Sequence, residues 1–138
     1  MSASAGEQPA PKQTILVVDD AGLVRTRCRR FLVEHGYDVL EAQNGLEAIA
    51  RYKQARPDAV LLDITMPEMD GLTALREIRK LDPEANVVMV TGMHQQAIIM
   101  DALKSGAKDF VMKPFEPERV LLAVEKACGG PGGAALGG

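Results

Sequence analysis

The sequence predicts a single-domain α/β fold, a doubly wound parallel sheet of five strands with five helices in (βα)5 order. Three observations carry this prediction. The chain has 138 residues, of which 46% are hydrophobic and 25% charged, the size and balance of one globular domain. Short apolar runs alternate along it with segments of helical periodicity. Several runs are apolar at consecutive positions, which strands covered on both faces of a sheet require.

The predicted strands are the five apolar runs, at 15–18, 39–40, 59–62, 87–90 and 110–112. Each is followed by a helical segment, and helical crossovers between successive strands imply a parallel sheet with helices on both faces. In such sheets, binding sites lie outside the carboxyl ends of the strands.

The predicted helices each carry a face of side chains at spacings of three and four. In chain order these are Val24, Cys28, Phe31, Leu32 and His35; Leu46, Ile49 and Ala50; Leu72, Leu75 and Ile78; the stretch 95–105; and Val120, Ala123, Val124 and Ala127. Turn residues mark the helix boundaries. Gly36 and Gly106 end the first and fourth helices, Gly45 and Gly71 lie at the start of the second and third, and Pro117 opens the fifth.

Both ends of the chain are predicted to be flexible. Residues 1–13 are rich in Ser, Ala and Pro and are expected to form a disordered extension. Residues 129–138 hold six of the 13 glycines and are expected to form a flexible tail. The ordered domain is therefore predicted to span 14–128.

Composition excludes several function classes. Lys and Arg number 16 against 19 Asp and Glu, a formal charge of −3, which argues against a general nucleic-acid-binding surface. Aromatic residues make up 4% without Trp, which argues against stacking platforms. Cys28 and Cys128 have no metal-ligand spacing and suit a reducing compartment. The chain has no signal-peptide pattern and no membrane-spanning run, so a cytoplasmic protein without membrane contact is expected.

Polar side chains stand at four of the five strand ends. Asp19 and Asp20 follow the first strand, Asp63 the third, Thr91 ends the fourth and Lys113 follows the fifth. The second strand ends in Glu-Ala and offers no evident contribution. Three convergent carboxylates repel one another unless a cation is present, and a hard divalent ion such as Mg²⁺ resolves the repulsion. A carboxylate nucleophile, Mg²⁺ and an ammonium group together indicate phosphoryl transfer to an aspartate.

Each residue taken alone has a plainer interpretation. Asp19 and Asp20 could form a polar turn with a helix cap, and Asp63 could be a solvated loop acid. Thr91 could cap the next helix, and Lys113 could be a surface lysine. Their joint placement at one predicted sheet edge favours a site.

Four sequence blocks resemble the signature blocks of two-component response-regulator receiver domains. They are VVDD at 17–20, LDITMPEMDG at 62–71, VTG at 90–92 and FVMKPF at 110–115. The similarity covers about 14–128 and implies the flavodoxin/CheY-like form of the predicted fold.

The resemblance also implies an acceptor and a metal site. Asp63 would be the phosphoacceptor. Asp20, Asp63 and the backbone carbonyl of Thr65 would bind Mg²⁺, with Mn²⁺ as an alternative ion. Asp19 would assist, directly or through a water.

The remaining implied roles belong to the last two strands. Thr91 and Lys113 would hold the phosphoryl oxygens, and the Lys113–Pro114 bond would be cis. Phe110 occupies the family's switch position and would turn inward as Thr91 moves toward the phosphoryl group.

These roles imply a signalling switch that turns over no external substrate. A histidine kinase or phosphotransfer protein would be the donor. The output would be a protein partner or a homodimer, bound at the face of the fourth helix, fifth strand and fifth helix. Surplus apolar residues there fit either an output surface or ordinary wide burial: Ile98, Ile99, Met100, Leu103, Val120, Leu121, Leu122 and Val124. Four arginines of the first helix favour a solvated face over a donor-docking one: Arg25, Arg27, Arg29 and Arg30.

Within this family, the chain is most similar to single-domain chemotaxis regulators of the CheY type. The alternatives are a truncated receiver of a larger response regulator and a phosphorelay intermediate. A haloacid-dehalogenase-like phosphatase is disfavoured because Asp19 and Asp20 are adjacent, where that class has an Asp-x-Asp pattern. A flavodoxin-like cofactor binder is disfavoured because the two acids would repel a phosphate that lacks a bridging cation.

Overall fold

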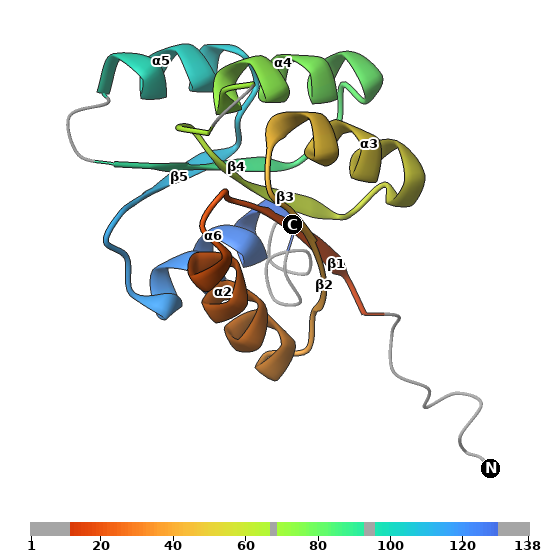
Figure 1. Ribbon diagram of the computed structural model, residues 1–138, viewed down its shortest axis with the longest axis vertical. Coiled ribbons are helices and arrows are strands. Elements are labelled where there is room, and N and C mark those ends of the chain that lie inside the picture. The colour runs from red at the N-terminus through yellow and green to blue at the C-terminus, as the bar shows by residue number, and fades with distance from the viewer. Residues whose placement is uncertain (1–11, 67–68, 93–95, 130–138) are drawn as a thin grey trace.

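The computed structural model describes residues 12–66, 69–92 and 96–129, and most of both predicted flexible ends lies outside these ranges. Five strands alternate with five helices along the chain (Figure 1). In order the elements are β1 (Thr14–Val18), α2 (Gly22–Glu34), β2 (Asp38–Ala42), α3 (Gly45–Ala55), β3 (Ala59–Asp63), α4 (Gly71–Leu81), β4 (Val87–Thr91), α5 (Gln96–Lys104), β5 (Asp109–Met112) and α6 (Pro117–Ala127).

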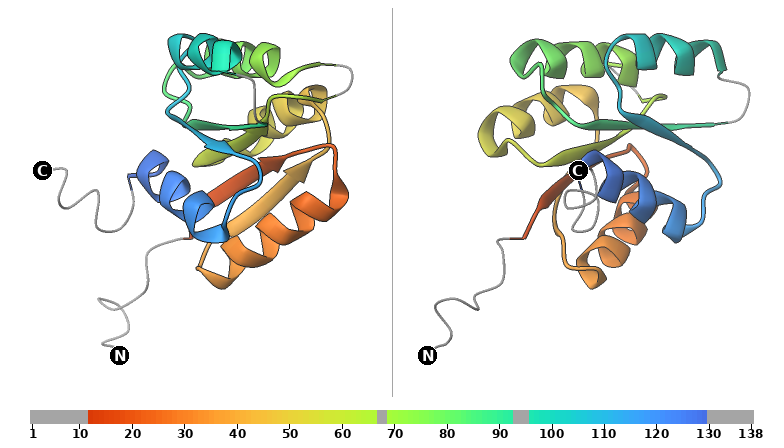
Figure 2. Two further views of the ribbon diagram at one scale, coloured as in Figure 1. Left: turned by 90° about the vertical axis from the view of Figure 1, so that its left-hand side faces the viewer. Right: turned by 180° about the vertical axis from the view of Figure 1, so that it is seen from behind.

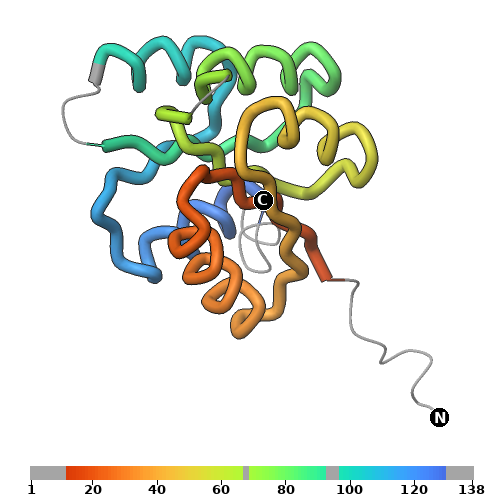
Figure 3. The backbone as a smooth tube through the Cα atoms, in the orientation of Figure 1, coloured from red at the N-terminus to blue at the C-terminus, as the bar shows by residue number. Residues whose placement is uncertain are grey.

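The strands form one parallel sheet in the order β2-β1-β3-β4-β5, which confirms the predicted (βα)5 fold. Helices α3, α4 and α5 cover one face, and α2 and α6 cover the other (Figures 1 and 2). The chain path shows how the first and last helices meet on the same side (Figure 3). None of the described helices is long and apolar enough to cross a lipid bilayer.

The core has two layers because consecutive strand residues point to opposite faces of the sheet. In β1, Ile15 and Val17 pack with α2 and α6, whereas Leu16 and Val18 pack with α3 and α4. The central strands β3 and β4 are buried at every position, as their uninterrupted apolar runs predict. The edge strand β2 is longer than the predicted 39–40, because its flanking polar residues interrupt the apolar signal.

The register brings the strand ends together at one edge. Val18 pairs with Leu62, Asp63 with Val90, and Thr91 with Met112. Residues that follow β1, β3, β4 and β5 therefore emerge side by side.

Side chains close the outer edge of the sheet at Phe110. Phe110 lies within the outer strand β5, and both of its backbone groups bond to side chains. The Phe110 N–H donates to Asp109 Oδ1 at 2.8 Å, and its carbonyl accepts from Arg119 Nη2 at 2.8 Å. Arg119 Nη2 also lies 3.6 Å from Asp109 Oδ1, which completes an ion pair along this edge.

Candidate functional site

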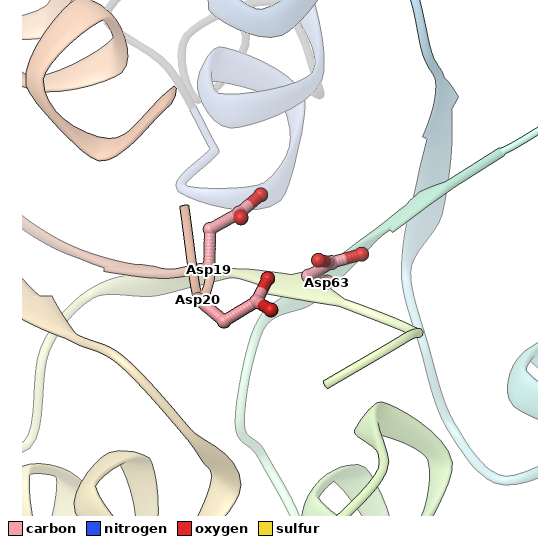
Figure 4. A group of neighbouring side chains, drawn as sticks. All are labelled: Asp19, Asp20 and Asp63. Atoms are coloured by element: carbon pink, nitrogen blue, oxygen red, sulfur yellow. The ribbon is translucent and has the colours of Figure 1, made fainter. Parts of the chain in front are cut away.

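Three carboxylates gather at the carboxyl edge of the sheet. Asp19 and Asp20 lie in the turn between β1 and α2, and Asp63 is the last residue of β3 (Figure 4). One oxygen of each lies within 4.8 Å of the other two. Asp19 and Asp63 are only 3% and 5% exposed, whereas Asp20 faces solvent. The structure thus brings together the acids that the sequence predicts.

Lys113 supplies the positive charge of the site. It follows β5, and its Nζ lies 3.0 Å from Asp19 Oδ2 and 3.5 Å from Asp63 Oδ2. The Lys113–Pro114 peptide bond is cis, the isomer that the family resemblance implies. The ammonium group bridges the two buried carboxylates and leaves the exposed one to solvent.

The two buried carboxylates differ in how their oxygens are engaged. Asp19 Oδ1 accepts from the Ala21 N–H at 2.9 Å, so both Asp19 oxygens have protein donors. Both Asp63 oxygens have donors as well, but at longer distances: Oδ1 accepts from the Thr65 N–H at 3.3 Å, and Oδ2 lies 3.5 Å from Lys113 Nζ. The first contact brings the Thr65 backbone beside the Asp63 carboxylate. Asp20 and Asp63 are therefore better placed than Asp19 to bind an ion directly.

A divalent cation suits this donor set. Three ionised carboxylates and one ammonium leave an excess of two negative charges, which one divalent ion balances. The donors are oxygens, the ligands that Mg²⁺ prefers, and one of the acids is open to solvent, so bound waters can complete an octahedral shell.

The electrostatics of the site follow from its burial. Burial and the neighbouring charge of Asp19 raise the pKa of Asp63 to about 6, while Lys113 opposes the shift. Burial alone would lower the pKa of Lys113, but its hydrogen bonds to Asp19 and Asp63 and their negative charges raise it. Without a metal ion, Asp63 therefore holds its proton into the mildly acidic range, while Lys113 stays charged.

The raised pKa of Asp63 predicts how stability changes with pH. An ordinary aspartate has a pKa of 3.8, so the metal-free folded state binds the Asp63 proton more tightly than the unfolded state does. The resulting stability, about 3 kcal/mol, is complete below about pH 4 and is lost as the pH rises through about 6. Urea unfolding of the metal-free proteins measures this effect. As the pH rises from about 4 through about 6, the free energy of unfolding of wild type should fall relative to that of Asp63→Asn. A constant difference would contradict the assignment, and added Mg²⁺ should offset the loss.

Thr91 and Phe110 lie on the neighbouring strands β4 and β5. Thr91 is fully buried at the end of β4, and its hydroxyl donates to the Gly92 carbonyl at 3.1 Å. Phe110 is half-buried and packs against the core beneath α3, α4 and α5. Thr91 thus lies at the end of the strand next to the one that Asp63 ends. Phe110 lies on the following strand, and its predicted switch role stays a prediction.

Arg25 contacts the backbone of the site, a role that the sequence analysis did not predict. Arg25 Nη1 donates to the Asp19 carbonyl at 2.6 Å, and its Nε pairs with Glu41 Oε1 at 3.1 Å. Arg27 and Arg30 are exposed, which fits either a solvated or a docking face, whereas the prediction of a solvated side chain is wrong for Arg25. The second strand also contributes, through Glu41. The sequence signal for this role was the position of Arg25, one turn inside a helix that begins next to Asp19 and Asp20.

Gly71 has a packing role at the site that the sequence analysis also did not predict. A Cβ at this position would lie 2.2 Å from the Asp63 carbonyl oxygen and 2.7 Å from Ile64 Cα. The start of α4 therefore packs directly on the backbone that carries Asp63, which only a glycine permits.

Four apolar side chains of α5, β5 and α6 are exposed. They are Met100 and Leu103 on α5, Met112 on β5 and Leu122 on α6. Other members of the predicted surplus belong to the core, since Ile99, Val120 and Val124 are buried. In the left view of Figure 2, β5 runs between the two helices at this edge of the molecule.

The chain is similar to known proteins over most of its length. The family described as the response regulator receiver domain matches residues 15–125. The chemotaxis protein CheY of Bacillus subtilis is 50% identical over 113 residues, 81% of this chain and 94% of the relative. That of Listeria monocytogenes is 52% identical over 114 residues, 82% and 96% of the two chains. The solved CheX–CheY–BeF3–Mg²⁺ complex from Borrelia burgdorferi matches with a TM-score of 0.80 and 33% identity, covering 88% of this chain and 92% of that one.

Proposed function

The chain belongs to the response regulator receiver domain family, and from that premise we propose that it is a signalling switch that accepts a phosphoryl group on Asp63. The observation that carries the proposal is the cluster of Asp19, Asp20 and Asp63 with Lys113 Nζ between the two buried acids. It combines a carboxylate nucleophile, oxygen ligands for Mg²⁺ and a fixed positive charge. The domain that performs this role spans 14–128 in the proposal.

In the proposed reaction, an Asp63 carboxylate oxygen attacks the phosphorus of a phosphohistidine. The new oxygen–phosphorus bond forms as the phosphorus–nitrogen bond breaks, and the released imidazole takes up a proton. Bound Mg²⁺, with Mn²⁺ as an alternative, would neutralise charge on the transferred oxygens; Asp20, Asp63 and the Thr65 carbonyl would hold it, with Asp19 assisting. Lys113 then pairs with a phosphoryl oxygen, and the Thr91 hydroxyl donates to another.

The switch follows from the new charge. Phosphorylation adds negative charge beside Thr91 and draws Lys113 away from Asp19. A movement of Thr91 toward the phosphoryl group makes room for Phe110 to turn inward, which changes the face formed by α5, β5 and α6. The protein acts as a phosphoacceptor in this scheme and turns over no external substrate.

The donor, in this proposal, is a histidine kinase or phosphotransfer protein that docks next to Lys113. An apolar groove of about 610 Å³ lies there, between α2 and the start of α6. Cys28, Phe31 and Phe115 are among the residues that line it, and Arg27 adds a positive charge. Such a groove suits a helix of the donor with apolar and acidic side chains.

The output, in this proposal, is that of a chemotaxis-type regulator in the cytoplasm. Two relatives about half identical in sequence are named as chemotaxis proteins. A protein partner or a second copy of the chain would cover the exposed Met100, Leu103, Met112 and Leu122.

The phosphoacceptor role is tested with a small phosphodonor. Incubation with acetyl phosphate and Mg²⁺ should add the mass of one phosphoryl group to the intact protein, and EDTA should prevent it. Peptide mapping after reduction of the acyl phosphate with borohydride should locate the group on Asp63. Labelling that persists in EDTA, or that falls on another residue, would overturn the proposal.

The output face is tested by capture of partners with and without beryllofluoride, a phosphate mimic. Leu122→Glu should reduce beryllofluoride-dependent capture by about tenfold or more, because it places a charge in an apolar contact. Leu46→Glu is the matched control, since Leu46 on α3 is 55% exposed and Leu122 53%. Equal losses in both variants would contradict the assignment. The identity of the captured protein shows which kind of output the chain has: a chemotaxis component, another phosphotransfer protein or a second copy of the chain.

A further inference from the structure

Arg25 and Glu41 form an ion pair directly behind the acidic cluster. Arg25 lies in the first turns of α2 and Glu41 near the end of β2. The Arg25 side chain is only 18% exposed; its Nε donates to Glu41 Oε1 at 3.1 Å and its Nη1 to the Asp19 carbonyl at 2.6 Å. The second Glu41 oxygen lies 3.4 Å from Arg29 Nη1, so Glu41 is itself held from two sides.

The turn that Arg25 contacts has little other support from side chains of α2. The N-cap residue of this helix is Ala21, whose side chain has no atom that can accept a hydrogen bond. Asp19 is fixed instead at its N–H, which donates to the Ala42 carbonyl at 3.2 Å, and at its carboxylate. The Asp19 carbonyl belongs to the peptide that leads into Asp20. Its contact with Arg25 therefore sets the plane of that peptide and the direction in which the exposed Asp20 carboxylate projects.

We infer that Arg25 is a positioning residue for the divalent-cation site, which acts through the Asp19 carbonyl and is held in place by Glu41. Arg25 contacts none of the oxygens proposed to bind the ion. Because Glu41 balances its charge, its effect on the ion is one of geometry. Arg25→Gln and Arg25→Lys both lose the forked contact to Glu41 and Asp19, and both weaken ion binding.

A charge effect would give the opposite sign. Removing a positive charge beside a cation site raises the affinity for the cation, so Arg25→Gln would bind Mg²⁺ more tightly than wild type does. Arg25→Lys would keep the charge and bind like wild type. The two explanations are thus separated by the direction of the change.

The experiment measures binding of Mg²⁺ alone by titration calorimetry, with urea unfolding of each variant to show that it is folded. Both Arg25 variants should lose about tenfold in affinity, as supporting residues of metal sites commonly do. Arg29→Gln is the matched control, because Arg29 is 59% exposed and meets only the outer oxygen of Glu41, one helical turn further along. It should stay within about twofold of wild type. Tighter binding by Arg25→Gln, unchanged binding by Arg25→Lys, or an equal loss in Arg29→Gln would overturn the inference.

A double-mutant cycle tests the role of Glu41. If Arg25 and Glu41 act as a unit, Arg25→Gln with Glu41→Gln should lose no more affinity than the worse single variant. Additive losses would show that the two residues act separately. The inference rests on the metal-binding part of the proposed function, and the outcomes stay distinct. Wild type that fails to bind Mg²⁺ would contradict the proposed function, whereas binding that is insensitive to Arg25 would contradict only this inference.

Discussion

Asp63→Asn should reduce Mg²⁺-dependent labelling by acetyl phosphate to the level seen without the donor. The amide cannot form the acyl phosphate, and it removes one of the three carboxylates that would hold the ion. The size and shape of the side chain are kept, so the fold should survive. The metal-free variant should also be more stable than wild type at neutral pH, because burial and the charge of Asp19 no longer oppose an ionised group there.

Intact-mass spectrometry measures the labelling, and Asp38→Asn is the matched control. Asp38 begins β2 at the opposite edge of the sheet and is exposed, so the same chemical change there should leave labelling at the wild-type level. A labelled Asp63→Asn variant would assign the acceptor to another carboxylate, with Asp19 and Asp20 the first to be tested.

Gly71→Ala should lower the free energy of unfolding by about 3 kcal/mol. The new methyl group would lie 2.2 Å from the Asp63 carbonyl oxygen and 2.9 Å from its carbonyl carbon. These are backbone atoms, which cannot turn aside as the end of a flexible side chain can. Hydrogen bonds also hold the start of α4 in position. The Gly71 N–H donates to the Ile64 carbonyl at 2.8 Å, and the Thr73 N–H donates to the side chain of Asp70, the N-cap residue. Relief of the clash must therefore move the end of β3.

Urea unfolding measures this loss, and Gly22→Ala is the matched control. A methyl group on Gly22 would meet its nearest neighbour, Arg25 Nη2, at an ordinary 3.6 Å. Because alanine favours helix over glycine, this variant should match wild type or exceed it by up to about 1 kcal/mol. Gly71→Ala should also weaken Mg²⁺ binding, because the shifted backbone carries Asp63. Equal stabilities of the two variants would show that the packing of α4 on β3 is looser than the structure has it.

The sequence predicted the fold and the acids for the same physical reason. Fully buried parallel strands need consecutive apolar residues, so β1, β3 and β4 are visible as runs. Parallel strands also end at a common edge, so Asp19, Asp20 and Asp63 could be placed together without knowing any distance. The edge strand β2 was harder to delimit, because a strand that is covered less completely tolerates polar residues such as Asp38 and Glu41.

The contacts that Arg25 and Gly71 make with the site could not be predicted from sequence patterns. Arg25 lies one turn inside a helix that begins at the acid pair, but its position among several arginines does not show that its side chain contacts the Asp19 carbonyl. Gly71 looked like an ordinary helix start, because its close approach to Asp63 depends on how α4 packs across the chain. Both features depend on how two segments of the chain pack against each other, which the local sequence of neither segment determines.

The closed edge at Phe110 also limits how this protein can aggregate. An outer strand with open N–H and C=O groups is a template on which strands of other molecules can be added without limit. Here Asp109 and Arg119 already occupy both backbone groups of Phe110, the central part of β5. At Phe110, a molecule that approaches this side meets side chains in place of free backbone groups. The interruption of the ladder at Phe110 therefore favours contacts of limited extent over continued strand addition, which would suit the reversible partner binding proposed above.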